Sequence, residues 1–592
     1  GAARAFSDAE DRARAAEAWL SAPWVRVAGF IPVLGRVPDV GAAVARAAVL
    51  TARAANGVAG LLAQLPDGPA SLLPERGRIP VERIAPLAPA LASADALVER
   101  ALAEVRTSPA TLLPTPVAAA RRRSEEELAD LHRGTHAAAL ILDRLPGFLG
   151  ADGPRRYLLF AENPAELRGT GGILGAWAPV ALRDGRVRIG RFRPLQAFPK
   201  LDPDDVPPPN PDYARLYDPL RRDGLFWTAI NVTPDFPSAA RAILNGYRAI
   251  GGPPVQGVLT ADVFALQALV RLTGPARVPA IDRSLGAGEV VAFVANEAYA
   301  EFPGAARRKR LLGDVAGAVL DRFLRHPPRD PSALRTLLHV AAEGHVEVFS
   351  TDPVMEEGLA ATGVGGALRG GPGDLLGIFT SSGSGSKVDY YQERRVTYEI
   401  RLGADGASRT LVRLDLTNHA PSSGAPRYVI GPSVPGREPG ESVPLVNLYC
   451  APGCRLVRAA RDGRPVGLWA DRELGLRLFQ DSFSIPSGGH RTLQVELWRP
   501  GAWTGNSSGG TYRLTVLSQR PIRPASLRIV VHPPEGMHVT ATEPPMRVEG
   551  GVAIWEGIPS RRLELEASFA PPLATRLWRD VVRFLSRPAI RF

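Results

Sequence analysis

The spacing of hydrophobic positions changes twice along the chain. Up to about residue 150, small and apolar residues recur at the three- and four-residue intervals typical of amphipathic helices. Ser7 with Glu10 and Ser124 with Glu127 have the spacing of a capping box, a common helix start. The pattern predicts a helical region over residues 1–150, an elongated hairpin or stalk, with helices at about 5–21, 42–65, 81–105 and 124–145.

Short apolar runs and helical periods then alternate. The pair Asp184-Gly185 between two apolar runs is typical of a hairpin turn. Residues 198–220, rich in Pro and Asp, are expected to form a loop. The alternation predicts a central α/β domain over residues 151–362. Its expected strands lie at 157–160, 176–182, 187–192, 257–259 and 345–350, and its expected helices at 237–250, 261–272, 287–300, 305–325 and 331–342.

A Gly- and Ser-rich segment over residues 363–390 separates this region from the next and indicates a linker or exposed loop. Beyond it the helical period disappears, and short strand-like runs with turn signals between them predict a β-sandwich-like domain over 391–520. Residues 521–570 are a second β module or its continuation, with the junction at Pro521 to Pro524 as a possible boundary. The predicted fold class is multidomain α+β. The expected strands are 395–402, 409–417, 445–449, 491–498, 512–517, 527–531 and 563–568.

The end of the chain, residues 571–592, is a basic amphipathic tail in which Leu577, Trp578 and Val581 share one helical face. Such a helix lies on a membrane surface or docks on its own protein with an arginine-rich outer face. No apolar run reaches the roughly 18 residues that span a bilayer. The abrupt start at Gly1 indicates a processed or trimmed beginning.

The formal charge of +11 alone suggests a nucleic-acid binder, but the residue types argue against that class. Arginine carries almost all of the positive charge and is spread along the chain, whereas lysine occurs only at 200, 309 and 387. With no helix-turn-helix, zinc-finger or RNA-recognition signal, nucleic acid is not an expected partner. Attraction to anionic lipid or to an anionic wall polymer stays open.

The two cysteines, Cys450 and Cys454, flank an Ala-Pro-Gly turn. Turn residues can fold the chain so that the two sulfur atoms approach, which predicts a small disulfide loop and an oxidising compartment. The alternative is two unpaired small residues. A zinc site would need further soft ligands, which the sequence does not offer at a suitable spacing, so no metal site is expected.

Residues 162–172 follow the first predicted strand of the central domain, where open α/β sheets often bind ligands. An arginine there can grip a phosphate or carboxylate, an amide and a hydroxyl can hydrogen-bond to it, and glycines let backbone N–H groups approach an anion. The segment lacks the spacing of a Walker or Rossmann loop. The candidate ligand-binding residues are Asn163, Glu166, Arg168, Thr170, Gly171 and Gly172.

Other polar residues at predicted strand or loop ends could line the same cleft: Arg191, Arg193, Asn231, Asp235 and Asp262. The alternative for the segment itself is structural, with Glu166 and Arg168 forming a buried ion pair that pins a tight glycine turn. No nucleophile elbow is present, so no catalytic residue is assigned.

Several blocks of the chain resemble a bacterial family of proteins known as domain of unknown function 4012, in order and in spacing. The resemblance implies an N-terminal membrane helix with the rest of the protein outside the cytoplasm. The blocks are the run from Tyr157 to Gly172, Asp235-Phe236-Pro237, Gly257-Val258, Leu272-Thr273-Gly274-Pro275 and Lys387-Val388-Asp389-Tyr390-Tyr391.

The central domain is more distantly similar to the LytR-CpsA-Psr family, which moves glycopolymers from polyprenyl phosphate carriers to the cell wall. The similarity rests on an arginine-bearing loop after an early strand and on residues 258–279. Those enzymes have an Arg-Asp pair after the third strand, where this chain has Arg193-Pro194.

These observations give competing hypotheses of different classes. The first is a non-catalytic, extracytoplasmic envelope protein with a role in structure, assembly or wall association, which forms homo-oligomers or binds an envelope glycopolymer and needs no cofactor. The alternative is a phosphotransferase-like enzyme or binder that acts on polyprenyl-linked glycopolymers through the Arg168 segment, with magnesium aiding phosphoryl transfer.

Overall fold

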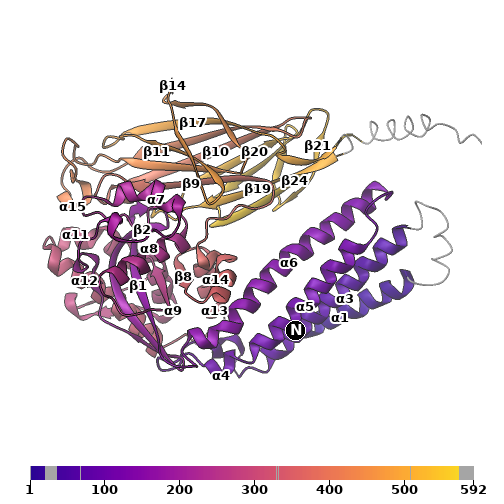
Figure 1. The fold of residues 1–592 in the computed structure, drawn as a ribbon, viewed down its shortest axis with the longest axis horizontal. Coiled ribbons are helices and arrows are strands. Elements are labelled where there is room, and N and C mark those ends of the chain that lie inside the picture. The colour runs from indigo at the N-terminus through magenta and orange to yellow at the C-terminus, as the bar shows by residue number, and fades with distance from the viewer. Residues whose placement is uncertain are drawn as a thin grey trace, which may run out of the picture.

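The computed structural model describes residues 2–20, 36–66, 68–328, 330, 332–506 and 509–572. They form a helical arm, a central α/β domain and a β-sandwich, which confirms the multidomain α+β class (Figure 1). Within these residues no helix is long and apolar enough to cross a membrane. The predicted amphipathic tail lies outside the described residues except for its first two positions.

The arm contains long helices packed side by side in chain order (Figure 1). Alanines such as Ala47, Ala54, Ala94 and Ala101 fill the contact between two of these helices, and their small side chains let the backbones approach closely. The last helix starts nine residues before the predicted Ser124, because Pro116 in its first turn already fits the helix start. The helices are α1 (Ala2–Leu20), α3 (Arg36–Ala63), α4 (Val81–Ile84), α5 (Leu87–Thr107) and α6 (Thr115–Phe148).

The central domain is built on a mixed sheet in the order β3-β2-β1-β5-β8, with β4 beside β2. β1 and β5 are parallel, and the other neighbours are antiparallel. β1 runs to Arg168, well beyond the strand predicted at 157–160, because buried residues continue along it to its end. The strands are β1 (Arg155–Arg168), β2 (Gly171–Arg183), β3 (Arg186–Ile189), β4 (Arg193–Pro194), β5 (Gly257–Ala261) and β8 (Val346–Ser350).

Helices surround this sheet, and a small ribbon of β6 (Ala276–Val278) and β7 (Arg283–Leu285) lies beside them. The loop expected at 198–220 contains a helix, because Asn210 caps it and Pro211 fits its first position. The helices are α7 (Pro211–Tyr217), α8 (Phe236–Ala249), α9 (Val263–Thr273), α10 (Val290–Ala292), α11 (Ala298–Glu301), α12 (Ala305–Arg325), α13 (Ala333–Ala342) and α14 (Pro353–Ala360).

The β-sandwich is formed by two large sheets, and a short helix, α15 (Arg427–Ile430), lies in one connection. In sheet order, one sheet contains β14 (Arg464–Pro465), β13 (Arg455–Arg461), β17 (His490–Arg499), β11 (Ser408–Asn418), β10 (Gln392–Leu402), β20 (Ser526–His532), β23 (Val552–Gly557) and β22 (Arg547–Glu549). The other contains β15 (Trp469–Glu473), β16 (Leu476–Ser482), β12 (Pro444–Cys450), β9 (Asp374–Ser382), β19 (Gly509–Ser518), β24 (Arg562–Ala570) and β21 (His538–Glu543), with β18 (Trp503–Asn506) paired to β19.

Two boundaries expected from the sequence differ from the structure. The linker predicted at 363–390 is wrong for 374–382, because β9 is an inner strand with both faces buried. The junction at Pro521 to Pro524 does not divide two modules, since β20 pairs with β10 and β24 pairs with β19 across it. Residues 521–570 therefore continue the same sandwich.

The central domain and the sandwich share a hydrophobic core. Leu375 and Phe379 of β9 join Phe160 of the central sheet in one buried cluster. Leu376, on the opposite face of β9, belongs to the cluster between the two sandwich sheets. β9 therefore connects the two cores.

The predicted disulfide is confirmed. Cys450 ends β12, Cys454 immediately precedes β13, and the two form a disulfide. Their Cα atoms lie 6.2 Å apart across the Pro-Gly turn. The bridge therefore closes the connection by which the chain passes from one sandwich sheet to the other.

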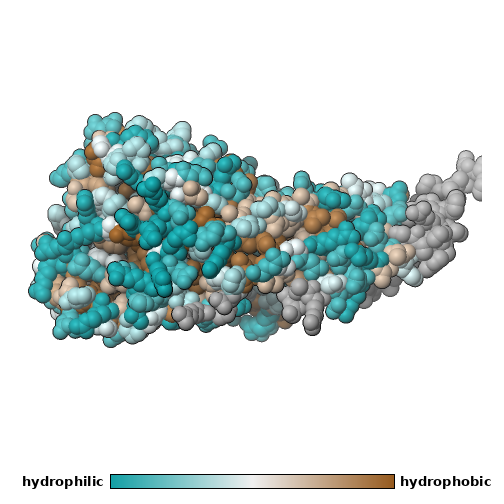
Figure 2. Space-filling view, turned by 90° about the horizontal axis from the view of Figure 1, so that it is seen from below, coloured by the Kyte–Doolittle hydropathy of each residue, from teal (hydrophilic) through white to brown (hydrophobic). Residues whose placement is uncertain are grey.

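The face seen from below is mostly hydrophilic, with smaller hydrophobic groups along the arm (Figure 2). Exposed large apolar side chains in this part of the chain include Leu112 and Leu131 of the arm. Scattered apolar residues of this kind are normal on soluble surfaces.

The tight contact between α3 and α5 makes a prediction about side-chain size. Ala101 is fully buried there, so Ala101→Leu should lower the free energy of unfolding by about 1–3 kcal/mol through overpacking. Ala103→Leu, on the exposed face of the same helix, is the matched control and should change it by less than about 0.5 kcal/mol. Urea unfolding followed by circular dichroism measures both, and equal effects would contradict this packing.

Candidate functional site

The candidate segment, residues 162–172, forms the tip of the hairpin between β1 and β2. Arg168 pairs with Gly171 across the turn, and irregularities in the pairing lie after Ala161 and after Asn163. This tip contacts β9 and the single helical turn Val388–Tyr391 of the sandwich. The segment is thus part of the sheet and lies between two domains.

Glycines are required at this tip because other protein atoms lie against them. A Cβ atom on Gly169 would lie 2.2 Å from the carbonyl oxygen of Val232. One on Gly172 would lie 2.3 Å from the carbonyl carbon of Asn163. Gly171 faces the Glu162 carboxylate, whose Oε2 would lie 2.8 Å from an added Cβ. The glycines therefore allow close packing of protein against protein.

Glu166 and Arg168 form the ion pair that the structural alternative proposed. Arg168 Nη2 lies 3.1 Å from Glu166 Oε1, and Lys387 Nζ lies 3.1 Å from Glu166 Oε2. Arg168 is only 7% exposed, and its Nε and Nη1 donate to the carbonyl oxygens of Thr228 and Leu167 at 2.9 and 2.8 Å. Each guanidinium nitrogen thus already has a protein acceptor.

A chain of hydrogen bonds extends this pair into the sandwich. The backbone N–H of Leu167 donates to Asp389 Oδ2 at 2.8 Å. Gln519 donates to the carbonyl oxygens of Arg168 and Thr380, at 2.7 Å each. Arg394 donates to Gln519 Oε1 at 2.9 Å. We call Glu166, Arg168, Lys387, Asp389 and Gln519 the joint network.

Opposite charges in the joint network stabilise one another. Burial opposes ionisation of Glu166, but Lys387 and Arg168 outweigh it and hold the pKa of the carboxyl below its usual value. Burial likewise opposes the charge on Lys387, yet Glu166 raises the pKa of the ammonium group. Burial raises the pKa of Asp389. The Glu166–Lys387 pair is therefore ionised inside the protein.

Thr170 and Asn231 belong to a second, neighbouring set of hydrogen bonds. The Thr170 hydroxyl donates to Glu162 Oε1 at 2.8 Å. Asn231 Nδ2 donates to Thr170 Oγ1 and to the carbonyl oxygen of Gly172, both at 2.8 Å. Burial, followed by repulsion from Glu347, raises the pKa of Glu162 well above its usual value. Glu162 thus accepts hydrogen bonds from Thr170 and Asn231 at a buried position.

The side chain of Asn163 also hydrogen-bonds to other groups of the protein. Its Nδ2 donates to the Tyr299 hydroxyl at 3.1 Å and its Oδ1 accepts from the Ala165 N–H at 3.0 Å. The side chain therefore ties the hairpin to the segment around α11.

Asp235 and Asp262 are helix caps. Asp235 accepts from the N–H and hydroxyl of Ser238 at the start of α8, and from the Leu368 N–H at 2.8 Å. Asp262 caps α9 and also lies 2.7 Å from His345 Nδ1. Both carboxylates are thus occupied by local backbone or side-chain partners.

The structure does not bring Arg191 and Arg193 into these networks. Both are exposed. Arg193 lies farther back along the hairpin, with its guanidinium 5.7 Å from the ring centre of Trp177. Among the described residues no group of histidine, cysteine or acidic side chains has the geometry to hold a metal ion.

A third buried carboxyl group links the central domain to the sandwich. Glu473 of β15 accepts hydrogen bonds from the hydroxyls of Tyr217 and Thr233, at 2.6 Å each, and from Tyr449. Burial raises the pKa of Glu473 to about 7. Together with the joint network, this group fixes the hairpin and α7 against the sandwich.

Sequence reasoning missed the residues that contact the central domain from far along the chain. Lys387 and Asp389 stand in one of the blocks that carry the family resemblance, and Lys387 is one of only three lysines, so a signal existed. Gln519 and Glu473 carry no comparable signal. Their roles depend on contacts between residues more than 200 positions apart.

Removing the Glu166 charge should destabilise the protein strongly. Glu166→Gln leaves Lys387 buried without its carboxylate, which costs about 3–5 kcal/mol for a broken buried pair. Glu357→Gln, on the exposed face of α14, is the matched control and should have little effect. Urea unfolding measures both, and a small loss for Glu166→Gln would show that Lys387 is not held as a buried charge.

Glu473 should make stability fall with rising pH. Because the folded pKa of about 7 exceeds the usual 4.5, its contribution is complete below pH 4.5 and is lost as pH rises to about 7. Glu473→Gln does not titrate, so the difference in unfolding free energy between wild type and variant should shrink by up to about 3 kcal/mol over this range. Urea unfolding at several pH values measures this, and a constant difference would contradict it.

Comparisons with known proteins reveal little beyond the central domain. No curated protein matches the chain. A protein of Legionella pneumophila described as a nutrient binding protein aligns at 8% identity and a TM-score of 0.23, over 36% of this chain and 77% of that one. Leukotriene A4 hydrolase of Saccharomyces cerevisiae aligns at 8% identity and a TM-score of 0.20, over 30% of this chain and 29% of that one. At these TM-scores neither likeness bears on function.

The match to a family model is confined to the central domain. Residues 152–299 match the family described as "Protein of unknown function (DUF4012)". This range contains the hairpin of β1 and β2, β5 and the helix caps Asp235 and Asp262. Four of the five blocks that resemble this family lie inside the matched range, and the block at 387–391 lies outside it. The chain therefore carries a DUF4012 domain at residues 152–299.

Proposed function

We propose that this protein is a non-catalytic scaffold of the cell envelope that acts outside the cytoplasm. The proposal rests on the hydrogen bonds of Arg168, because each of its guanidinium nitrogens already has an acceptor within the protein. The arginine best placed to bind a phosphorylated ligand is buried and donates to Glu166, Thr228 and Leu167. Through Glu166, which also pairs with Lys387, it takes part in the contact between the two domains.

A ligand at Arg168 would have to break this arrangement. A phosphate group would compete with Glu166 for Nη2, and displacement of Glu166 would leave Lys387 without its carboxylate. Leaving a buried charge without its partner in this way costs several kcal/mol. The geometry therefore supports a structural joint better than a phosphotransferase site.

The shape of the molecule also fits a scaffold. α6 has 34 residues and is thus roughly 50 Å long, and it runs beside one end of the sandwich (Figure 1). A groove between α6 and the sandwich has parts of about 770 and 930 Å³, lined by residues of both. An ion pair between Arg513 of β19 and Glu126 of α6 crosses it. Such a groove offers room for an elongated partner, and an envelope glycopolymer is the partner that we propose.

The disulfide supports the proposed compartment. Disulfides persist in oxidising surroundings and are rare in the cytosol of most organisms. The bridge between Cys450 and Cys454 lies in the sandwich next to β12, among buried residues. A location outside the cytoplasm suits this bond.

Native mass spectrometry of the protein purified from its own cells tests the proposal. We expect wild type, Arg168→Ala and the control Arg191→Ala to carry the same bound partners and to form the same oligomers. Arg168→Ala should differ only in a lower melting temperature, because it leaves Glu166 with one cation fewer. Arg191 is exposed, so its variant should melt like wild type.

One result would contradict the scaffold proposal. A phosphorylated lipid or glycan retained by wild type and Arg191→Ala, but absent from folded Arg168→Ala, would replace the scaffold proposal with the carrier-binding one.

A further inference from the structure

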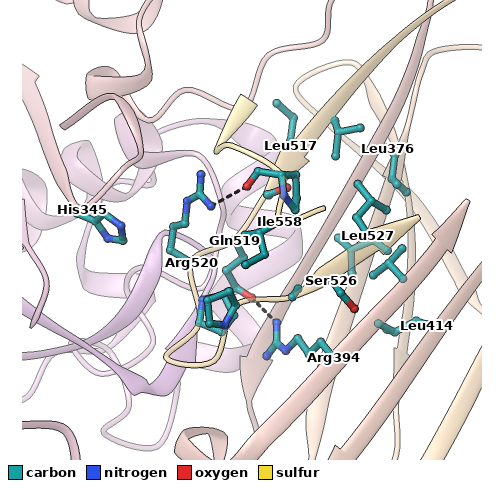
Figure 3. A pocket seen from close by; sticks show the side chains of 18 of the residues that line it. His345, Leu376, Arg394, Leu414, Leu517, Gln519, Arg520, Ser526, Leu527 and Ile558 are labelled. Atoms are coloured by element: carbon teal, nitrogen blue, oxygen red, sulfur yellow. Dashed lines mark hydrogen bonds between the residues drawn. The ribbon is translucent and has the colours of Figure 1, made fainter. Parts of the chain in front are cut away.

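A cavity of about 150 Å³ lies between the two sandwich sheets, where they face the central domain (Figure 3). Its walls come from β9 and β19 on one sheet and from β10, β11 and β20 on the other. Residues from the connections after β19 and β23 complete it, and Phe264 and His345 of the central domain lie at its side. The space therefore opens at the contact between domains.

The lining is divided by polarity. Figure 3 shows His345, Arg520, Gln519 and Arg394 along one side of the cavity and leucines along the other. The leucines come from β9, β11, β19 and β20: Leu376, Leu414, Leu517 and Leu527. A site of this kind suits a ligand with one polar end and one apolar end.

Arg394, a polar residue of this lining, has unused hydrogen-bonding capacity. It is 5% exposed, and it donates from Nε to Gln392 Oε1 and from Nη1 to Gln519 Oε1, at 2.9 Å each. Its buried Nη2 has no hydrogen-bond partner among the residues that the structure describes. Burial lowers the pKa of this guanidinium to about 10, which still leaves it charged at neutral pH.

The neighbouring cation, Arg520, already has a carboxylate partner. Arg520 donates to the carbonyl oxygens of Glu343 and Pro559, at 3.0 and 2.9 Å, and pairs with the Glu343 carboxylate. Arg394, by contrast, forms no ion pair with a carboxylate of the described chain, and Asp389 acts on it only at longer range. A buried cation without a paired anion favours an anion brought by a ligand.

Ile558 marks an exposed part of the cavity lining. This residue follows β23 in the lining and is 63% exposed, which is unusual for an isoleucine. The connection from Gln519 to Ala525 lies in the lining as well. An apolar ligand that entered there would cover part of Ile558.

We propose that this cavity binds a small monocarboxylate with an apolar body of about six carbon atoms. Its carboxylate accepts from Nη2 of Arg394 after the guanidinium turns toward the cavity, since Nη2 is itself buried, and its apolar part lies among the leucines of the opposite side. The size follows from volume, since an apolar cavity of about 150 Å³ accommodates benzene. The single charge follows from the single free nitrogen, because Nε and Nη1 are already bonded.

Hexanoate and 1-hexanol are the probes, because they share the apolar chain and differ in charge. Calorimetric titration of the whole protein at neutral pH should show hexanoate binding at least 10-fold more tightly than hexanol. Arg394→Met should weaken hexanoate at least 10-fold and leave hexanol unchanged. Ala525→Phe, which places an aromatic ring in the lining while keeping Arg394, should weaken both.

Other outcomes overturn the proposal. Equal affinity for the two probes in wild type would remove the role of the charge, and unchanged binding by Ala525→Phe would place the ligand elsewhere. Because Arg394 also supports Gln519, the melting temperature of Arg394→Met is compared with wild type first. If that variant does not fold, the comparison of probes in wild type and in Ala525→Phe decides. Neither result depends on the glycopolymer that we propose for the scaffold.

Discussion

Burial of the Glu166 charge is the constraint on which the contact between domains depends. A carboxylate removed from water needs cations close by. One of them, Arg168, stands on the same strand, but the other, Lys387, comes from 221 residues farther along the chain. The central domain alone would leave Glu166 underpaired, and the sandwich alone would leave Lys387 without its anion. Each domain thus completes the other.

The same dependence is visible in the apolar core. β9 is buried on both faces, one facing the central domain and the other facing the second sandwich sheet. Glu473 repeats the principle with polar groups, because its hydrogen-bond donors come from both domains. Both polar and apolar contacts therefore join the central domain to the sandwich.

Local patterns in the sequence were enough for the long helices, about half of the described strands, the disulfide and the overall class. They were also enough for the ion pair of Glu166 and Arg168, as one of two alternatives, because the residues are two positions apart on one strand. β9 was missed since its run of apolar residues stands between Gly- and Ser-rich flanks. Lys387, Gln519 and Glu473 could not be placed, because nothing local tells a single sequence which distant residue pairs with them.

The order of strands in the sandwich has a consequence for how the chain acquires its structure during synthesis. The helices of the arm contact their neighbours in sequence, so the arm can assemble early. β9 and β10, by contrast, each need a parallel partner that emerges more than 100 residues later, β19 and β20 respectively. Until then both strands have an unpaired edge, and such edges invite contact with other chains. The nascent protein must protect these edges until β19 and β20 have been made.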